Sequence, residues 1–238
     1  MDSSRHIDIT FDFRSDTPLG RDPDTWSRTL GRYHEILWSK PLPNGGHLAL
    51  RGTRPPIYLH DESQEGGLCL SSDSVIPTFR RQASIAHIIN QISDEDFDSF
   101  YSLGYTIGGM MVFPAVRVKR QMTINGQRGC HPRIKDRFDL TVECIRRHYS
   151  NETSPLAGTL ARYDDFFRLF CDFRGYVEFF LLQDLVTEDC SAVRFFAPFD
   201  DFRTSPLPGS VSEYLDYRRL AMSFIEARNR RISESYNI

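Results

Sequence analysis

The sequence lacks most of the patterns that would place it in a familiar functional class. Its five cysteines are odd in number and widely spaced, with no CxxC pair, so we expect neither a disulfide framework nor a structural zinc site. No apolar run approaches the roughly 18 residues that a membrane-spanning helix needs. The first residues have no apolar stretch behind a basic start, as a secretory signal would have. We therefore expect a cytoplasmic protein with reduced thiols and no membrane partner.

Common nucleotide and hydrolase motifs are also missing. The chain contains no GxxxxGKS/T, GxGxxG or GxSxG, which leaves P-loop, dinucleotide-binding and serine-hydrolase chemistry without support. Lysine is scarce, because only three of the 29 basic residues are lysine and the rest are arginine. Arginine forms two parallel hydrogen bonds to phosphate or carboxylate, which lysine cannot do. A GC-rich genome would produce the same bias, so the bias alone does not indicate a ligand.

The residues that are present predict one α+β domain over 1–238. Of the 238 residues, 40% are hydrophobic and 13% aromatic, enough for a sizeable core. Alternation of apolar and polar residues predicts short strands in the N-terminal half, and helical spacing predicts a mainly helical C-terminal half. The expected strands are 7–13, three within 46–79, 105–114 and 192–199. The expected helices are 26–38, 83–92, 93–104, 133–149, 154–170, 175–186 and 210–232.

Several polar motifs are explained by ordinary structural roles. The glycine pair in "TIGG" (106–109) indicates close packing more than a phosphate loop. Asp73 stands alone near the end of a strand, and "TPLGRDPD" (17–24) is typical of a loop. The acids between residues 8 and 16 indicate a solvated strand face.

Charge is unevenly distributed, although the net charge is only −3. Residues 117–147 hold nine Arg or Lys and three Asp or Glu, whereas residues 164–201 hold three Arg and nine Asp or Glu. These two segments could face each other in the fold. Alternatively, the basic segment could bind an anion.

The chain resembles a family of uncharacterised bacterial proteins that is catalogued as a domain of unknown function. The resemblance rests on "YTIGGMMVFP", "TINGQRG", "IKDRFDLTVECIRRHY" and "GYVEFFLLQDLV", and it covers nearly the whole chain. It implies no activity, cofactor or catalytic residue. "TIGGMMVFP" followed by "TIN" is also similar to a segment in one branch of HNH-type nucleases. This chain has glycines where that segment has Asn, and it lacks the preceding Asp-His pair.

The densest polar stretch, 123–149, is the most promising place for a site. On the expected helix 133–149, Asp136, Asp139 and Glu143 fall on the stripe opposite the apolar face. One interpretation is a solvated face of ion pairs with arginines one turn away, which contribute only about 0.2–0.5 kcal/mol each. The other uses Leu140, which lies within the polar stripe and indicates that this face is covered. Covered carboxylates are paired or hold a metal ion.

The residues around this stripe suit a phosphate-bearing ligand. "NGQRG" (125–129) is expected to form a loop that presents backbone N–H groups and Arg128 to an anion. Asn125, Arg133 and Arg137 complete the predicted substrate-binding set. His131 is a candidate general base near neutral pH, although a histidine in a loop is more often an ordinary surface residue.

The leading hypothesis is therefore a metal-assisted enzyme that acts on nucleic acid or a nucleotide, as a nuclease would. Its predicted catalytic residues are His131, Asp136, Asp139 and Glu143, and the three carboxylates would bind Mg²⁺ or Mn²⁺. The alternative is a non-catalytic protein-interaction module whose charged segments recognise a protein partner. A link to toxin or phage-defence systems rests only on the kind of family that the chain resembles.

Overall fold

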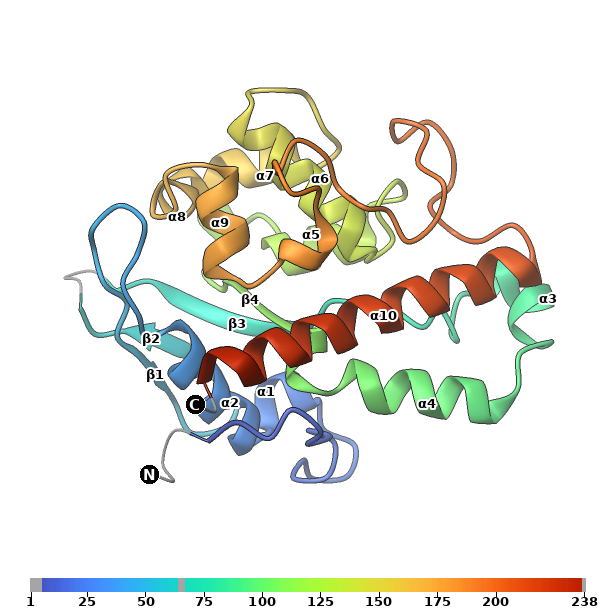
Figure 1. Cartoon of the computed structure of the whole chain (residues 1–238), viewed down its shortest axis with the longest axis horizontal. Coiled ribbons are helices and arrows are strands. Elements are labelled where there is room, and N and C mark those ends of the chain that lie inside the picture. The colour runs from blue at the N-terminus through green and yellow to red at the C-terminus, as the bar shows by residue number, and fades with distance from the viewer. Residues whose placement is uncertain (1–5, 64–66, 237–238) are drawn as a thin grey trace.

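A four-stranded antiparallel sheet organises the first half of the chain (Figure 1). The computed structural model describes residues 6–63 and 67–236. The strands pair in sequence order: β1 Leu50–Gly52, β2 Leu59–Asp61, β3 Cys69–Ser74 and β4 Met110–Pro114. In the longest pairing, Asp73 of β3 lies opposite Met111 of β4. Every residue of β4 is buried, which is why this strand is apolar throughout.

Short helices surround this sheet, and their caps follow the sequence closely. The N-terminal half contains α1 Pro23–Trp26, α2 Arg28–Trp38, the 3₁₀ turn η2 Ala83–Ile85, α3 Ala86–Ile89 and α4 Asp94–Gly104. Helix α4 begins after Ser93, whose side chain accepts a hydrogen bond from the Asp96 N–H. Three acidic side chains in its first turn interact favourably with the positive end of the helix dipole and so stabilise the helix. The predicted start of this helix is confirmed.

The second half of the described chain is mainly helical, as expected. It contains η3 Ile107–Gly109, η4 Val118–Arg120, α5 Ile124–Cys130, α6 Phe138–Tyr149, α7 Ala157–Leu160, η5 Ala161–Tyr163, α8 Asp164–Arg168, α9 Phe173–Phe179, η6 Gln183–Leu185 and α10 Val211–Tyr236. The chain is thus an α+β domain. No helix in residues 6–63 and 67–236 is both long and apolar enough to cross a membrane.

Helix α10 holds the two halves together. It runs along the molecule with α4 beside it and α5 to α9 on the other side (Figure 1). Its buried residues recur every three or four positions, which produces one continuous stripe. The stripe includes two polar residues. Arg228 donates to the carbonyls of Gly108, Met110 and Phe180, and the Asn229 Oδ1 accepts the Gly108 N–H at 2.7 Å. Together they fix the backbone that enters β4.

The glycine pair before β4 is required by close packing, as the sequence indicated. A Cβ at Gly109 would lie 2.2 Å from the Gly104 carbonyl oxygen, and one at Gly108 would lie 2.5 Å from the Ile225 carbonyl oxygen. Both obstacles are backbone atoms, so neither can rotate away.

Gly109→Ala is therefore expected to destabilise the protein strongly, by about 3 kcal/mol or more, because the backbone must shift or overpack. The measurement is urea unfolding followed by circular dichroism. Gly158→Ala is the matched control, because a Cβ there meets nothing within 4 Å. Since Gly158 lies in α7, the control should be neutral or stabilising by up to about 1 kcal/mol. Equal stability of the two variants would contradict this account.

Two predicted strands are wrong. Residues 7–13 form turns, because Asp8 and Asp12 accept hydrogen bonds from the backbone two residues on, at Thr10 and Arg14. Ile7 and Phe13 are nevertheless buried.

The segment 192–199 forms no strand, and only Val193 makes an isolated bridge, to Val186. Side chains of the α6 region bind its backbone groups in place of a neighbouring strand. The Phe196 N–H donates to Asp139, and the Ala197 carbonyl accepts from Arg137.

Several elements of the second half also differ from expectation. The segment 125–129, expected as a loop, lies within helix α5, with Thr123 accepting the Gly126 N–H at its start. The helix expected over 133–149 begins only at Phe138, since Lys135 and Asp136 have φ of 47° and 68°. The helix expected over 154–170 is divided into α7, η5 and α8.

His34 is a buried, neutral histidine in the core beneath the sheet. Its Nε2 lies 2.9 Å from the Ser72 Oγ, and its Nδ1 accepts from the Trp38 Nε1 at 2.9 Å. Burial, with a smaller effect of Arg228, lowers the pKa of His34 from 6.5 to about 3.

His34 should make the fold acid-sensitive. The unfolded chain binds a proton at His34 below pH 6.5 and the folded chain does not, so this stability is complete above pH 6.5 and is lost as pH falls toward 3. Its share of the unfolding free energy should be about 2 kcal/mol lower at pH 5 than at pH 7. Urea unfolding at both values of pH, compared with His34→Gln, isolates this share. An identical pH dependence in the two proteins would exclude it.

Candidate functional site

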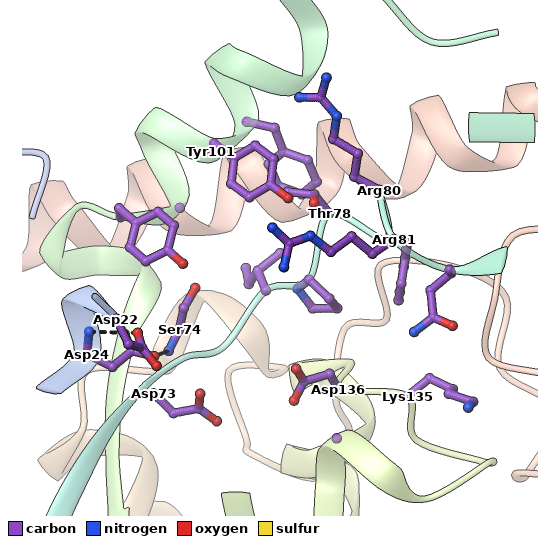
Figure 2. A pocket seen from close by; sticks show the side chains of 18 of the residues that line it. Asp22, Asp24, Asp73, Ser74, Thr78, Arg80, Arg81, Tyr101, Lys135 and Asp136 are labelled. Atoms are coloured by element: carbon purple, nitrogen blue, oxygen red, sulfur yellow. Dashed lines mark hydrogen bonds between the residues drawn. The ribbon is translucent and has the colours of Figure 1, made fainter. Parts of the chain in front are cut away.

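A polar cavity of about 680 Å³ lies beside the end of β3. Three parts of the fold form its walls: the loop before α1 with α1 itself, the segment 76–82 together with α4, and the turn that precedes α6. Four aspartates lie along one side, and Arg81 reaches in from the opposite side, as Figure 2 shows. The aspartates are Asp22, Asp24, Asp73 and Asp136, and the basic lining residues are Arg21, Arg80, Arg81 and Lys135.

Asp24 is the least satisfied carboxyl group in this cavity. Its Oδ2 accepts the Ser74 N–H at 3.2 Å, whereas its Oδ1 is buried and has no hydrogen-bond partner in the described part of the chain. Asp22 caps α1 by accepting the Asp24 N–H. Burial, reinforced by the neighbouring Asp73 and Asp22, raises the pKa of Asp24 well above its usual range. This carboxyl group is therefore favoured in its protonated form at a pH where an ordinary aspartate is ionised.

Asp73 and Asp136 are bridged by one buried guanidinium, that of Arg128. The Arg128 Nη1 lies 2.6 Å from the Asp73 Oδ2 and 2.8 Å from the Asp136 Oδ1. Its Nη2 donates to the Val75 and Asp136 carbonyls, which fixes the plane of the group. Burial raises the pKa of Asp73 to about 7; Asp136 acts in the same direction and Arg128 opposes it. Asp73 can thus exchange a proton near neutral pH.

Two basic side chains of the cavity lining are available to a ligand. Neither Arg81 nor the Lys135 side chain has an ion pair or hydrogen bond within residues 6–63 and 67–236. Arg80 differs, because it pairs with Asp94 at 2.6 Å and lies over the Phe97 ring. Arg21 lies over the Trp26 ring. An anion in the cavity would therefore meet Arg81 and Lys135 first.

The chain as a whole matches one protein family. A family described as a family of unknown function, DUF6994, matches residues 7–232. The chain belongs to DUF6994. The resemblance seen in the sequence is confirmed by this match. Searches of curated proteins and of solved structures found no match. Membership of DUF6994 brings no activity, so the function has to be inferred from the cavity.

The structure separates the residues that the sequence assigned to one site of this DUF6994 chain. Asp136 lines the cavity, and Arg128 supports it from the interior. Asp139 is fully buried and forms a fork-shaped pair with Arg137, and its Oδ2 also accepts the Phe196 N–H. Glu143 accepts from two arginines one turn along α6, Arg146 at 2.9 Å and Arg147 at 2.7 Å.

The remaining predicted residues lie outside the cavity lining. His131 is half-buried, and its Nδ1 accepts the Arg133 N–H. Burial and Arg133 lower the pKa of His131. The Arg133 side chain donates to the Arg203 carbonyl. The Asn125 Nδ2 donates to the Ser71 Oγ, and its Oδ1 is buried without a partner in the described part.

The carboxylates of Asp136, Asp139 and Glu143 do not come together to form the predicted metal site. Among the residues that the structure describes, no group of three or more His, Cys, Asp or Glu side chains is arranged to hold a metal ion. The oxygens of Asp139 and Glu143 already accept from guanidinium groups. An ion pair also connects the basic and acidic segments, Arg147 with Asp201.

Sequence reasoning missed Asp24, Arg81 and Lys135 entirely, and it dismissed Asp73 as isolated. Asp24 lies in a Pro- and Gly-rich stretch that is typical of a loop. One signal was available for Asp73, a carboxylate on a strand that is otherwise apolar or neutral. Such a residue needs a buried cationic partner, which turned out to be Arg128.

Proposed function

We propose that this chain is an enzyme that acts on a phosphate-bearing substrate, with the cavity at Asp24 as its active site. The observation that carries the proposal is the buried Asp24 Oδ1, which has no partner in the described part and belongs to a residue lining the cavity. Buried carboxyl groups are normally hydrogen-bonded or paired. A carboxyl group kept unpaired and protonated is costly to the fold, and such groups occur preferentially at functional sites.

Phosphate recognition is assigned to Arg81 and Lys135. A guanidinium and an ammonium group without other partners provide the charge-assisted hydrogen bonds that a phosphate group needs. Arg81 extends toward the middle of the cavity (Figure 2). The net charge of −3 gives no general attraction for polyanions. Binding would therefore depend on these local groups.

Proton transfer is assigned to Asp24 and Asp73. Asp73 titrates near neutral pH, where a general acid or base works best. Arg128 acts as a positioning residue, because it holds Asp73 and Asp136 in a fixed geometry and does not itself line the cavity. The role of Mg²⁺ or Mn²⁺ remains a prediction. Of the three ligands expected from the sequence, only Asp136 lies at the cavity.

A substrate screen tests the proposal. The purified chain is incubated with nucleotides, sugar phosphates, short RNA and short DNA, each with Mg²⁺, with Mn²⁺ or with EDTA. We expect turnover of at least one phosphate-bearing compound, and none by the folded Asp24→Asn variant. The EDTA series separately tests the metal requirement. Wild-type turnover by Asp24→Asn would place the active site elsewhere.

Arg81→Gln tests the phosphate subsite. Because it removes a charge-assisted hydrogen bond worth about 1.5–3 kcal/mol, KM for the phosphate-bearing substrate should rise about tenfold or more. Stability should hardly change, since Arg81 is exposed. Arg230→Gln is the control, an exposed arginine on α10. If both variants keep the wild-type KM, Arg81 does not bind phosphate.

A non-catalytic interaction module is the second candidate. A groove of about 550 Å³ beside α10 is lined by Phe195, Phe199 and Leu220, and the two phenyl rings stack at 4.1 Å. Partly exposed aromatic side chains of this kind are enriched at protein interfaces. This candidate predicts no turnover in the screen and no effect of Asp24→Asn on partner binding.

A further inference from the structure

The charges in the cavity are arranged for a substrate whose phosphate is bound away from the reacting bond. Four carboxyl groups lie on one side, with the buried Arg128 as the cation that bridges two of them. Of the two available cations, Arg81 lies opposite the aspartates, whereas Lys135 lies beside Asp136 at the edge of the group and extends away from it (Figure 2). Phosphate oxygens would be repelled by the aspartate side and attracted to the arginine side. The part of the substrate beside Asp24 and Asp73 should therefore be neutral or positive.

Carboxyl pairs of this kind suit one type of reaction. A protonated carboxyl group can donate a proton to a leaving group, and neighbouring carboxylates stabilise positive charge that develops in the transition state. Cleavage of a glycosidic bond needs both, because its transition state resembles an oxocarbenium ion. Hydrolysis of a phosphoester needs the opposite arrangement, with cations around the reacting group.

We infer that the cavity hydrolyses the N-glycosidic bond of a nucleoside phosphate, and this inference rests on the proposed function. The phosphate is bound by Arg81 and Lys135, and the sugar–base junction lies against Asp24 and Asp73. One of these two carboxyl groups donates its proton to the leaving base nitrogen as the C1′–N bond breaks. The oxygen of a water molecule bonds to C1′, and its proton passes to the other carboxylate. The products are the free base and the sugar phosphate.

Size and lining agree with this ligand. A volume of about 680 Å³ lies within the range of about 300–1,000 Å³ that is typical of small-molecule sites. The half-buried Tyr101 and Tyr105 also line the cavity, and aromatic rings are common stacking partners of nucleobases. Amino and ring N–H groups of a base can donate to the aspartates, which accept hydrogen bonds when ionised.

The experiment measures which product forms. The purified chain is incubated between pH 5 and pH 8, in EDTA, with nucleoside monophosphates of each base and with the matching nucleosides. Chromatography follows the free base, and a colorimetric assay follows inorganic phosphate. We expect the free base from a monophosphate, at least tenfold faster than from its nucleoside. The difference should disappear in Arg81→Gln, and release should fall at least 100-fold in Asp24→Asn and in Asp73→Asn. The melting temperature of each variant shows that it is folded.

Two results would overturn the inference. Release of inorganic phosphate without base would place the reaction at the phosphate group, and the proposed function would stand. Formation of neither product from any nucleotide by folded protein would exclude nucleotides as substrates. Calorimetric titration with ribose 5-phosphate and pyrophosphate then judges the proposed function separately. Binding that Arg81→Gln weakens would support a different phosphate-bearing substrate, and no binding would reject the phosphate subsite.

Discussion

Asp24→Asn is expected to abolish turnover and, at the same time, to raise the melting temperature. Loss of a general acid or base lowers rates by about 10²- to 10⁴-fold. The same change removes a buried carboxyl group whose ionisation the fold opposes. An amide oxygen can still accept the Ser74 N–H. We expect a gain of about 1 kcal/mol, which corresponds to about 2–4 °C for a chain of this size.

The pH dependence of this gain follows from the sign of the pKa shift. A carboxyl group whose folded pKa is raised favours the folded state at low pH, and this contribution is lost as pH rises through the folded pKa. The folded wild type should therefore be penalised most at high pH, and the advantage of Asp24→Asn should be larger at pH 8 than at pH 5. Differential scanning calorimetry at both values measures it.

Asp165→Asn is the matched control for this experiment. The Asp165 side chain is fully exposed and lies 3.4 Å from Arg168, a contact worth little in solvent. The control should keep both activity and melting temperature. A loss of stability in Asp24→Asn at every pH would mean that the carboxylate stabilises the fold, and its assignment to the active site would lose its main support.

Asp139→Asn is expected to have the opposite signature, a large loss of stability. Asp139 is fully buried and neutralises Arg137, which is itself buried. Removing one partner of a buried ion pair leaves an uncompensated charge and costs about 3–5 kcal/mol. Urea unfolding at pH 7 measures this loss.

The same variant distinguishes a structural from a metal-binding role of Asp139. If the ion pair is its role, the double variant Arg137→Met with Asp139→Leu should recover part of the stability, because no charge is then left unpaired. Glu152→Gln is the control from the same region; its carboxylate is half exposed beside Arg146. An Asp139→Asn protein of wild-type stability that has lost metal-dependent turnover would instead support the predicted metal site.

Sequence patterns correctly predicted the elements whose signals lie within a few neighbouring residues. Helix α10 was expected over 210–232 and spans Val211–Tyr236, because one apolar stripe repeats over its whole length. The cap at Ser93 and the three strands within 46–79 were likewise expected, since capping and turn residues act within a few positions. The strand prediction for residues 7–13 was wrong because the same residues can form Asx turns. The alternation of apolar and polar residues does not show whether a strand or the turns are more stable.

The candidate site was predicted only in part, and the reason is distance along the chain. Arg128 and Asp136 belonged to the expected site and lie at or directly behind the cavity. The helical wheel grouped Asp136 with Asp139 and Glu143, yet Asp136 adopts a left-handed conformation before the helix begins. A left-handed φ at a non-glycine residue depends on its surroundings, here the Arg128 guanidinium that donates to the Asp136 carbonyl.

By itself, the sequence determined the α+β class, the family, the long closing helix and the glycine pair beside β4, because each depends on composition or on neighbours a few residues apart. Only the tertiary structure decided that Asp24, Asp73 and Asp136 share one cavity with Arg81. These residues come from α1, β3, the turn before α6 and the segment 76–82. Burial next to one another raises the pKa of the Asp24 and Asp73 carboxyl groups. A pattern of neighbouring residues cannot show that groups far apart in sequence become buried together.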